Sequence, residues 1–201
     1  MDDFEQLFNE AWVIGKSYEY DRERMARIRV LRQRIVLARE ARAKRQQELL
    51  LEFKQPLLSL TTNVPGPDKD VPMAWLISQE ATRAIRSALD TARITVRYME
   101  TRNTASGPES FWILNEIGAK PLKRLMIDIE NGHPLGRLFD IDVLDVDGTH
   151  LERASFGVSP RRCLLCDRPA YECIRSQKHS LTELINEMGA LVLEYLREQT
   201  V

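Results

Sequence analysis

Residues 133–144 read HPLGRLFDIDVL, and the second half of this stretch has the strict alternation of a β-strand. In a strand, neighbouring side chains point to opposite faces and residues two apart share a face. Three apolar side chains therefore face one way, namely Phe139, Ile141 and Val143. The other face carries Leu138, Asp140, Asp142 and Leu144. The stretch predicts a strand that packs one face on a core and presents two carboxylates on the other.

The two aspartates can converge on one cation, because residues two apart lie about 6.5 to 7 Å apart along a strand. Mg²⁺ prefers one or two carboxylates together with phosphate oxygens and water, so the pair suits a metal-bound phosphate chain. An isolated Asp-x-Asp more often decorates an exposed edge strand. Here Gly136 forms a bend that lets backbone approach a ligand, and Arg137 adds a phosphate-seeking guanidinium. We predict that Asp140 and Asp142 bind Mg²⁺ and that Gly136 and Arg137 bind substrate.

Further elements follow outward from this strand. Strands are expected over residues 56–64 and 93–102, and helices over 71–92 and 121–130. Residues 106–109 predict a turn before the apolar run 111–114. Asp147 and Gly148 predict a hairpin turn onto residues 149–153. Ser180 and Glu183 form a capping box at the start of a last amphipathic helix. We expect one α+β domain over residues 54–201, with a mixed β-sheet flanked by helices, preceded by an N-terminal helical arm over residues 1–53.

The arm is basic. Residues 22–54 hold eleven Lys and Arg against four Asp and Glu, a charge of +7, which leaves −8 for the remainder of a chain whose net charge is −1. A long helix over residues 22–53 is predicted, with one narrow apolar stripe at Ile28, Leu31, Ile35 and Ala38, and a short helix is possible over residues 4–14. Arginines at helical spacing favour a solvated face, and the functional alternative is a dock for an acidic carrier protein.

The 201-residue composition excludes several classes of protein. There is no apolar run near the ~20 residues that span a bilayer, and the net charge does not suggest bulk affinity for nucleic acid. The acidic N-terminus lacks the features of a secretory signal, and three cysteines cannot all pair internally. A cytoplasmic protein with reduced thiols is expected.

Three cysteines and one histidine near the C-terminus are spaced as C-x2-C-x6-C-x5-H. This cysteine–histidine cluster comprises Cys163, Cys166, Cys173 and His179. The first pair has zinc-compatible spacing, but a helix over residues 170–178 would separate Cys173 from His179 by more than one turn. A reduced structural cluster is therefore favoured over a structural zinc site. The adjacent Arg161 and Arg162 are candidates for phosphate contacts, with surface solvation as the alternative.

Several unusual strings occur in one order: PGPDKD (residues 65–70), SGPE (106–109), HPLGRLFDIDV (133–143) and PRRCLLC (160–166), followed by Cys173 and His179. Together they resemble the CitX family, the citrate lyase holo-acyl-carrier-protein synthases. The resemblance runs from about residue 28 to the C-terminus and leaves residues 1–27 outside.

The resemblance implies an enzyme that takes 2′-(5″-triphosphoribosyl)-3′-dephospho-CoA and joins its phosphoribosyl end to a serine of the acyl carrier (gamma) subunit of citrate lyase, releasing pyrophosphate. A triphosphate with a pyrophosphate leaving group calls for a divalent metal and cationic donors. This agrees with the Mg²⁺ site expected from Asp140 and Asp142. His133 either braces the bend or removes the proton of the incoming serine, a task that one of the aspartates can also perform.

A more distant resemblance is to nucleotidyltransferases, whose pattern sets a Gly-Ser pair well before an Asp-x-Asp strand. Here Arg137 follows Gly136, and only three residues separate that glycine from Asp140, so only the acidic pair carries over. The superfamily usually has a third carboxylate, which Glu130, Asp145 or Asp147 can supply.

Two other kinds of function compete with the enzyme. A zinc-stabilised nucleic-acid binding module would use the cysteine–histidine cluster and the basic helix, but it leaves HPLGRLFDIDV unexplained. A noncatalytic scaffold would bind the lyase carrier subunit and leave its mass unchanged.

Overall fold

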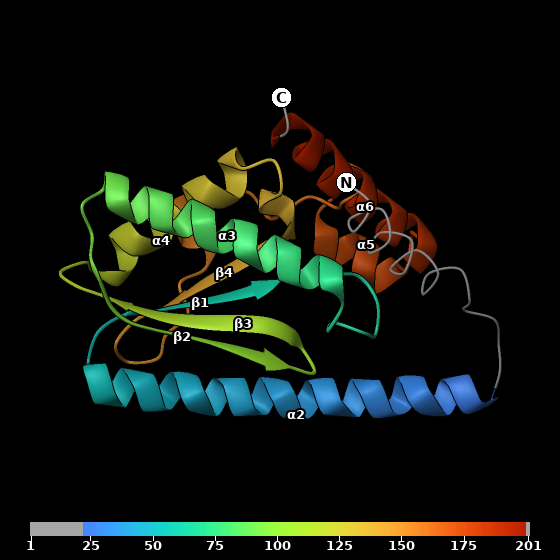
Figure 1. Ribbon diagram of the computed structural model, residues 1–201, viewed down its shortest axis with the longest axis horizontal. Helices are drawn as coiled ribbons and strands as arrows, with labels where there is room; N and C mark the ends of the chain where they lie inside the picture. Colours follow the sequence, from blue (N-terminus) through green and yellow to red (C-terminus); the bar gives the residue numbers. More distant parts are fainter. Residues whose placement is uncertain (1–21, 200–201) are drawn as a thin grey trace.

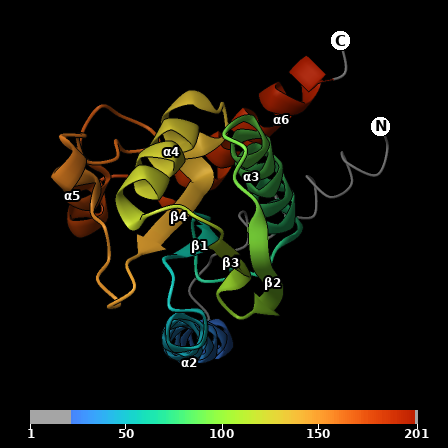
Figure 2. The same cartoon turned by 90° about the vertical axis from the view of Figure 1, so that its left-hand side faces the viewer.

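The structure is a computed structural model that describes residues 22–199, so the helix expected over residues 4–14 lies outside the described part. A four-stranded sheet in the order β2-β3-β1-β4 is covered by helices on both faces (Figures 1 and 2). The elements, in chain order, are α2 (Arg22–Phe53), β1 (Leu57–Thr62), α3 (Pro72–Thr91), β2 (Val96–Thr104), β3 (Gly107–Leu114), α4 (Ala119–Gly132), the 3-10 turn η1 (Gly136–Leu138), β4 (Phe139–Leu144), the 3-10 turn η2 (Arg153–Phe156), α5 (Ala170–Ser176) and α6 (Leu181–Gln199).

The α+β class and the flanking helices are confirmed, but the expectation of a mixed sheet was wrong. In the described part of the chain, β1 pairs antiparallel with both β3 and β4, and β2 pairs antiparallel with β3. The helical crossovers do join strands of the same direction, β1 to β2 through α3 and β3 to β4 through α4. Each of these strand pairs is separated by another strand, so no parallel ladder forms between them.

Two apolar clusters of unequal size lie on the two faces of the sheet. The larger one joins the sheet to α3, α4 and α6, and it includes Phe139, Ile141 and Val143 of β4. The smaller one joins the sheet to α2 and includes Leu144. Because side chains alternate along a strand, Asp140 and Asp142 lie on the α2 side of the sheet together with Leu144. The two-faced strand predicted from the sequence is confirmed for residues 139–144. Leu138, which was expected on the Asp140 face, instead lies in η1 and packs in the larger cluster.

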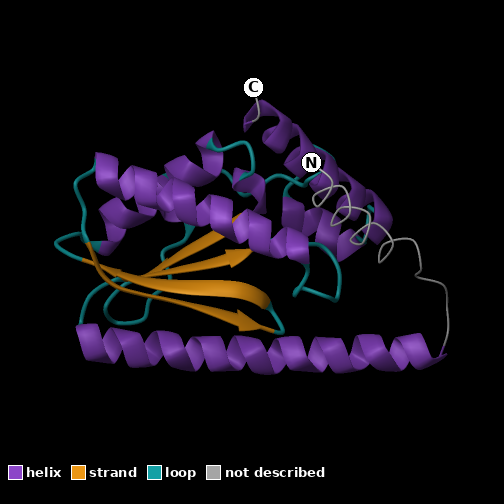
Figure 3. Ribbon diagram, in the orientation of Figure 1, coloured by secondary structure: helices purple, strands orange, loops and turns teal. Residues whose placement is uncertain are grey.

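α2 lies along one face of the sheet and extends beyond the strands at its N-terminal end (Figures 1 and 3). Ile35 is buried, and Ile28, Leu31 and Ala38 are half-buried, as the predicted stripe requires. The same stripe continues through polar residues that the sequence analysis left on the solvated face. Arg42 approaches Glu109 at 3.6 Å, the side chain of Arg45 donates to Glu100, and Gln46 Nε2 donates to Ser59 Oγ at 3.0 Å.

β4 is an edge strand, and α4 covers its outer edge. Glu130 of α4 accepts the backbone N–H of Ile141 at 3.0 Å, and Lys123 donates to the carbonyl of the same residue at 2.8 Å. The predicted turn after β4 forms, because Gly148 donates to the Asp145 carbonyl at 2.9 Å. Its expected second strand reduces to one bridge between Leu144 and His150. A longer strand would need the edge that the α4 side chains already occupy.

The last helix begins as predicted. Ser180 N–H donates to Glu183 Oε2 at 2.8 Å, and Glu183 N–H donates to Ser180 Oγ at 3.2 Å, which is the reciprocal capping box. Among the helices that the structure describes, none has an apolar stretch long enough to cross a membrane.

Candidate active site

The two predicted metal ligands lie side by side on β4, opposite Thr61 and Ser59 of β1. Asp140 Oδ2 accepts the Thr61 hydroxyl at 3.1 Å, and its Oδ1 accepts Arg161 Nη1 at 2.9 Å. Burial raises the pKa of Asp142, the charge of Asp140 raises it further, and Lys123 opposes both effects. Two acidic groups that repel each other on one strand face form the kind of oxygen-donor set that binds Mg²⁺. The donor chemistry of the two residues is compatible with Mg²⁺, and binding of the metal by Asp140 and Asp142 stays a prediction.

Arg161 connects this pair to α4. Its second amino group donates to Glu130, so one guanidinium bridges two carboxylates, and Arg153 pairs with the other oxygen of Glu130. The Glu130 side chain is only 2% exposed, and Arg153, Arg161 and the N–H of Ile141 engage both of its carboxylate oxygens. Glu130 is thus a structural anchor for Arg161 in this arrangement. The two other candidates for a third carboxylate, Asp145 and Asp147, accept backbone N–H groups in the turn after β4.

The sequence analysis missed a fourth acidic residue, Glu109, as a site candidate. It is fully buried on β3, next to Ser110, whose pairing partner is Leu60 on β1. Neither of its carboxylate oxygens accepts a hydrogen bond, and Arg42 and Arg102 approach it at 3.6 Å. Burial raises the pKa of Glu109. Alternation places its side chain with Phe111 on the α2 side of the sheet, which is also the side of Asp140.

The bend before β4 has a packing role. A Cβ on Gly136 would lie 2.3 Å from the Glu130 carbonyl oxygen, so glycine is required for close approach to α4. Arg137 donates to the backbone carbonyl of Arg162, and burial lowers the pKa of its guanidinium. The bend thereby holds the segment that carries Arg161 and Arg162.

His133 braces the same bend. Its Nδ1 accepts the backbone N–H of Leu135 at 3.0 Å, and its ring lies 4.8 Å from Phe139 and 5.2 Å from Tyr195. Burial lowers the pKa of His133. Phe139 points away from the face of Asp140, so this geometry favours the bracing role over the alternative role of general base.

Two cavities flank the arginine segment. One, of about 670 Å³, is lined by Glu130, His133, Pro134, Gly136, Arg153 and residues 157–160, and the other, of about 710 Å³, by Asn63, Pro65, Gly66, Lys69, Leu181 and part of the cysteine–histidine cluster. Arg137, Arg161 and Arg162 line both cavities. Cavities of this size accept ligands as large as a nucleotide, and three shared guanidiniums suit phosphate groups. Arg162 is 68% exposed and also pairs with Asp167 at 3.1 Å.

Lys69, from the PGPDKD string, is the other cation of the larger cavity. Burial lowers its pKa to about 8, with a smaller contribution from Arg39 of α2. Its ammonium donates to the carbonyl of Val64, and the backbone of Lys69 lies close to Gly107 of the SGPE string, where a Cβ would meet the Lys69 carbonyl oxygen at 2.7 Å. The structure therefore brings two distant strings of the sequence together at one end of the sheet.

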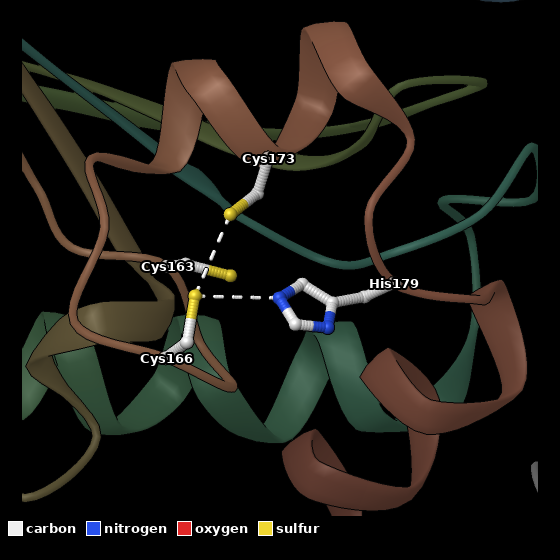
Figure 4. Close-up of side chains that lie close together, drawn as sticks. All are labelled: Cys163, Cys166, Cys173 and His179. Carbon is white, nitrogen blue, oxygen red and sulfur yellow. Dashed lines mark hydrogen bonds between the residues drawn. The ribbon is translucent and has the colours of Figure 1, made fainter.

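The cysteine–histidine cluster also assembles (Figure 4). The expected helix over residues 170–178 was too long: α5 ends at Ser176, and Gln177 has a φ of 47°, in the left-handed region. That conformation reverses the chain and brings His179 Nε2 to 3.4 Å from Cys166 Sγ. A backbone hydrogen bond from Arg168, followed by the contact with His179, lowers the pKa of Cys166 to about 6. Cys173 and His179 are therefore not held apart by the continuous helix that the sequence analysis had expected.

Comparison with known proteins now identifies the family. The family model for CitX, described as apo-citrate lyase phosphoribosyl-dephospho-CoA transferase, matches residues 30–195. This chain belongs to the CitX family. A protein of that description from Citrobacter koseri is 39% identical over 158 residues, which cover 79% of this chain and 86% of the relative. Relatives with the same description from Escherichia coli O1:K1 / APEC and Shigella flexneri serotype 5b are 37% identical over equal shares.

The CitX match spans all four strings from which the resemblance was inferred, and it includes both cavities and the cysteine–histidine cluster. It begins within α2, so the first turns of that helix precede the matched region. Family membership makes this chain a transferase, while the roles of individual residues and the likeness to nucleotidyltransferases stay predictions.

Proposed function

We propose that this protein transfers the phosphoribosyl-dephospho-CoA group from 2′-(5″-triphosphoribosyl)-3′-dephospho-CoA to a serine of the acyl carrier subunit of citrate lyase, releasing pyrophosphate. The observation that carries the proposal is the CitX match over residues 30–195. The geometry supports it. Arg161 contacts Asp140 and also lines both cavities, together with Arg137 and Arg162. A triphosphate needs both kinds of group, acidic ligands for its metal and cations for its phosphates.

In the proposed reaction, the serine oxygen of the carrier attacks the phosphorus nearest the ribose. A new P–O bond forms to the serine, the bond to the next phosphate breaks, and pyrophosphate leaves with that electron pair. The serine proton passes to a carboxylate of the Asp140 and Asp142 pair, because His133 Nδ1 is already engaged in the bend. Asp140 and Asp142 would hold Mg²⁺, which offsets the charge of the triphosphate when it is bound.

Arg161 has two roles in this proposal. Without substrate it neutralises Asp140 and Glu130, and with substrate its exposed edge and the guanidiniums of Arg137 and Arg162 contact phosphate oxygens. Glu109 is proposed as the third acidic residue, since it shares the α2 side of the sheet and has no hydrogen-bond donor of its own.

The test is a mass measurement. The protein is incubated with apo carrier subunit, triphosphoribosyl-dephospho-CoA and Mg²⁺, and the carrier is weighed by intact-mass spectrometry. A mass gain of one prosthetic group, abolished by chelator and accompanied by pyrophosphate, is expected. A carrier that binds this protein but keeps its mass would refute the transfer and favour a scaffold.

Substitution separates the site from the fold. Asp142→Asn is expected to abolish transfer and leave the melting temperature near that of the wild type. The matched control is Asp128→Asn, an exposed aspartate on α4. Wild-type turnover of Asp142→Asn would exclude this carboxylate from the metal site without excluding the reaction.

A further inference from the structure

The cysteine–histidine cluster is drawn from three places in the fold, and all four potential ligand atoms lie within 4.8 Å of one another. Cys163 and Cys166 lie in the segment before α5, Cys173 lies on α5, and His179 lies in the turn before α6, with its ring directed at the sulfur atoms (Figure 4). This convergence needs an explanation beyond packing, because an imidazole nitrogen directed at three sulfurs is an arrangement typical of a metal site.

The spacing inside the cluster matches tetrahedral zinc. Zn–S bonds of about 2.3 Å and Zn–N bonds of about 2.0 Å place two sulfurs about 3.8 Å apart and a sulfur and a nitrogen about 3.5 Å apart. Cys166 Sγ lies 3.5 Å from Cys173 Sγ and 3.4 Å from His179 Nε2. A disulfide would need about 2.05 Å between sulfurs, and the three cysteines are free thiols.

The backbone around the first two cysteines is organised as a narrow ribbon over residues 161–170. Cys163 N–H donates to the Arg168 carbonyl at 2.7 Å, and Ala170 N–H donates to the Arg161 carbonyl at 2.8 Å. The backbone of Arg168 also hydrogen-bonds to the Cys166 sulfur. Hydrogen bonds from outside the ligand set orient a metal-binding side chain.

The ribbon and α5 lack a hydrophobic core of their own. Between residues 145 and 180, the only buried side chains are those of Cys163 and Cys173. Ile174 and Tyr171 of α5 are 76% and 53% exposed. Leu151 and Leu164 are partly buried against the larger cluster, but the segment has no apolar cluster of its own, and metal ligation stabilises such segments in small domains.

We propose that this chain binds one structural Zn²⁺ ion through three thiolates and one imidazole, those of Cys163, Cys166, Cys173 and His179. The ion fixes the 161–170 ribbon, and with it the position of Arg161 against Asp140 and Glu130. Cys163, Cys173 and His179 also line the larger cavity, so the metal shapes one wall of the region expected to hold phosphates. The zinc site does not depend on the proposed function, because metal binding is measured without any substrate.

The first experiment measures metal content in tag-free protein purified without added zinc. One zinc per chain is expected by elemental mass spectrometry, with three thiols that react with a thiol reagent only after chelation. Replacement with Co²⁺ is expected to give the intense sulfur-to-cobalt charge-transfer absorption of a tetrahedral thiolate site. Protein that carries no zinc even after reconstitution, or that shows a disulfide between Cys166 and Cys173 by thiol counting, would overturn the proposal.

Variants identify the ligands. His179→Ala is expected to lose zinc, whereas His179→Cys keeps it because a fourth thiolate replaces the imidazole, and His150→Ala keeps it as the exposed control. Hydrogen exchange of the chelated protein is expected to rise over residues 157–180 while α3 and α4 stay protected. Full zinc content in both His179→Ala and Cys166→Ser would show that the metal is held elsewhere. The cobalt spectrum of the wild type does not depend on any variant folding.

Discussion

Replacement of Glu130 by alanine tests how the site is anchored. Glu130 is buried, it accepts the N–H of the edge residue Ile141, and it pairs with Arg153 and Arg161. Glu130→Ala removes the acceptor of a buried N–H, at about 2 kcal/mol. It also removes the shared ion-pair partner of Arg153 and Arg161, whose side chains are 16% and 22% exposed. Because solvent reaches both arginines, this loss adds about 2 kcal/mol, which is less than the cost of breaking a fully buried ion pair.

The free energy of unfolding is therefore expected to fall by about 4 kcal/mol, and the melting temperature by about 10 °C. Glu130→Gln keeps one oxygen for the Ile141 N–H and loses only the charge, so about half of that loss is expected. The free energy of unfolding of each variant is measured by urea unfolding monitored by far-ultraviolet circular dichroism, and its melting temperature by heating with the same signal. Glu194→Ala, at an exposed glutamate of α6, is the matched control.

Two results would refute this reasoning. Equal losses in Glu130→Ala and Glu130→Gln would show that the bond to the edge strand contributes nothing. A Glu130→Ala variant as stable as the Glu194→Ala control would show that Arg153 and Arg161 find other partners, and Arg161 would then not depend on α4 for its position.

Three further predictions concern the same region. Glu109→Gln is expected to lower transfer at least tenfold, as about 1.4 kcal/mol of lost transition-state stabilisation requires. The fold is expected to persist, because the amide has the same shape and only the ion pairs with Arg42 and Arg102 are lost. Turnover and calorimetry check this, and undiminished turnover would remove Glu109 from the site. Burial lowers the pKa of Lys69 from 10.5 to about 8, so the unfolded chain binds more protons than the folded chain between these pH values. The free energy of unfolding is therefore expected to rise with pH across that window. Urea unfolding at several pH values should show a smaller rise in Lys69→Met, and an equal rise would contradict the lowered pKa of Lys69. The double substitution Arg29→Glu and Arg32→Glu, on the exposed side of α2, is expected to raise KM for an acidic carrier but not for the triphosphate donor, and added salt should reduce the effect. Lys120→Glu, at an exposed lysine of α4, is the control. An unchanged KM for the carrier would show that the exposed side of α2 is only solvated.

Much of the fold could be predicted because local patterns decide it. The alternation at residues 139–144 required one buried face, and the spacing of Ile28 and Ile35 required one buried stripe on α2. The antiparallel pairing could not be predicted in this way. Two strands joined by a helix can be direct parallel neighbours, or another strand can lie between them, and the order of elements along the chain fits both arrangements. That insertion depends on packing between distant segments, which periodicity within a segment does not encode.

The candidate site divides along the same line. Asp140 and Asp142 could be proposed because they share a strand face, and Arg161 because it lies within the string PRRCLLC beside the cysteines. Glu109 and Arg42 were missed although a signal existed for one of them: Arg42 continues the 28-31-35-38 stripe by one more turn of helix. For His179 the signal was misleading, because only the left-handed conformation of Gln177 ends α5 early, and a glutamine there gives no warning of it.

The attachment of Ile141 to α4 has a consequence for how errors in folding would appear. Because side chains alternate, a slip of β4 by one residue would turn Asp140 and Asp142 into the larger apolar cluster and expose Ile141. Glu130 and Lys123 bind both backbone groups of Ile141, so they favour the same alignment of the strand as its pairing with β1. In a misaligned molecule the two carboxylates would no longer lie on the α2 side of the sheet, and the exposed apolar side chains would favour aggregation. The two hydrogen bonds of Ile141 to α4 thus add to the pairing with β1 in keeping both aspartates on the α2 side of the sheet.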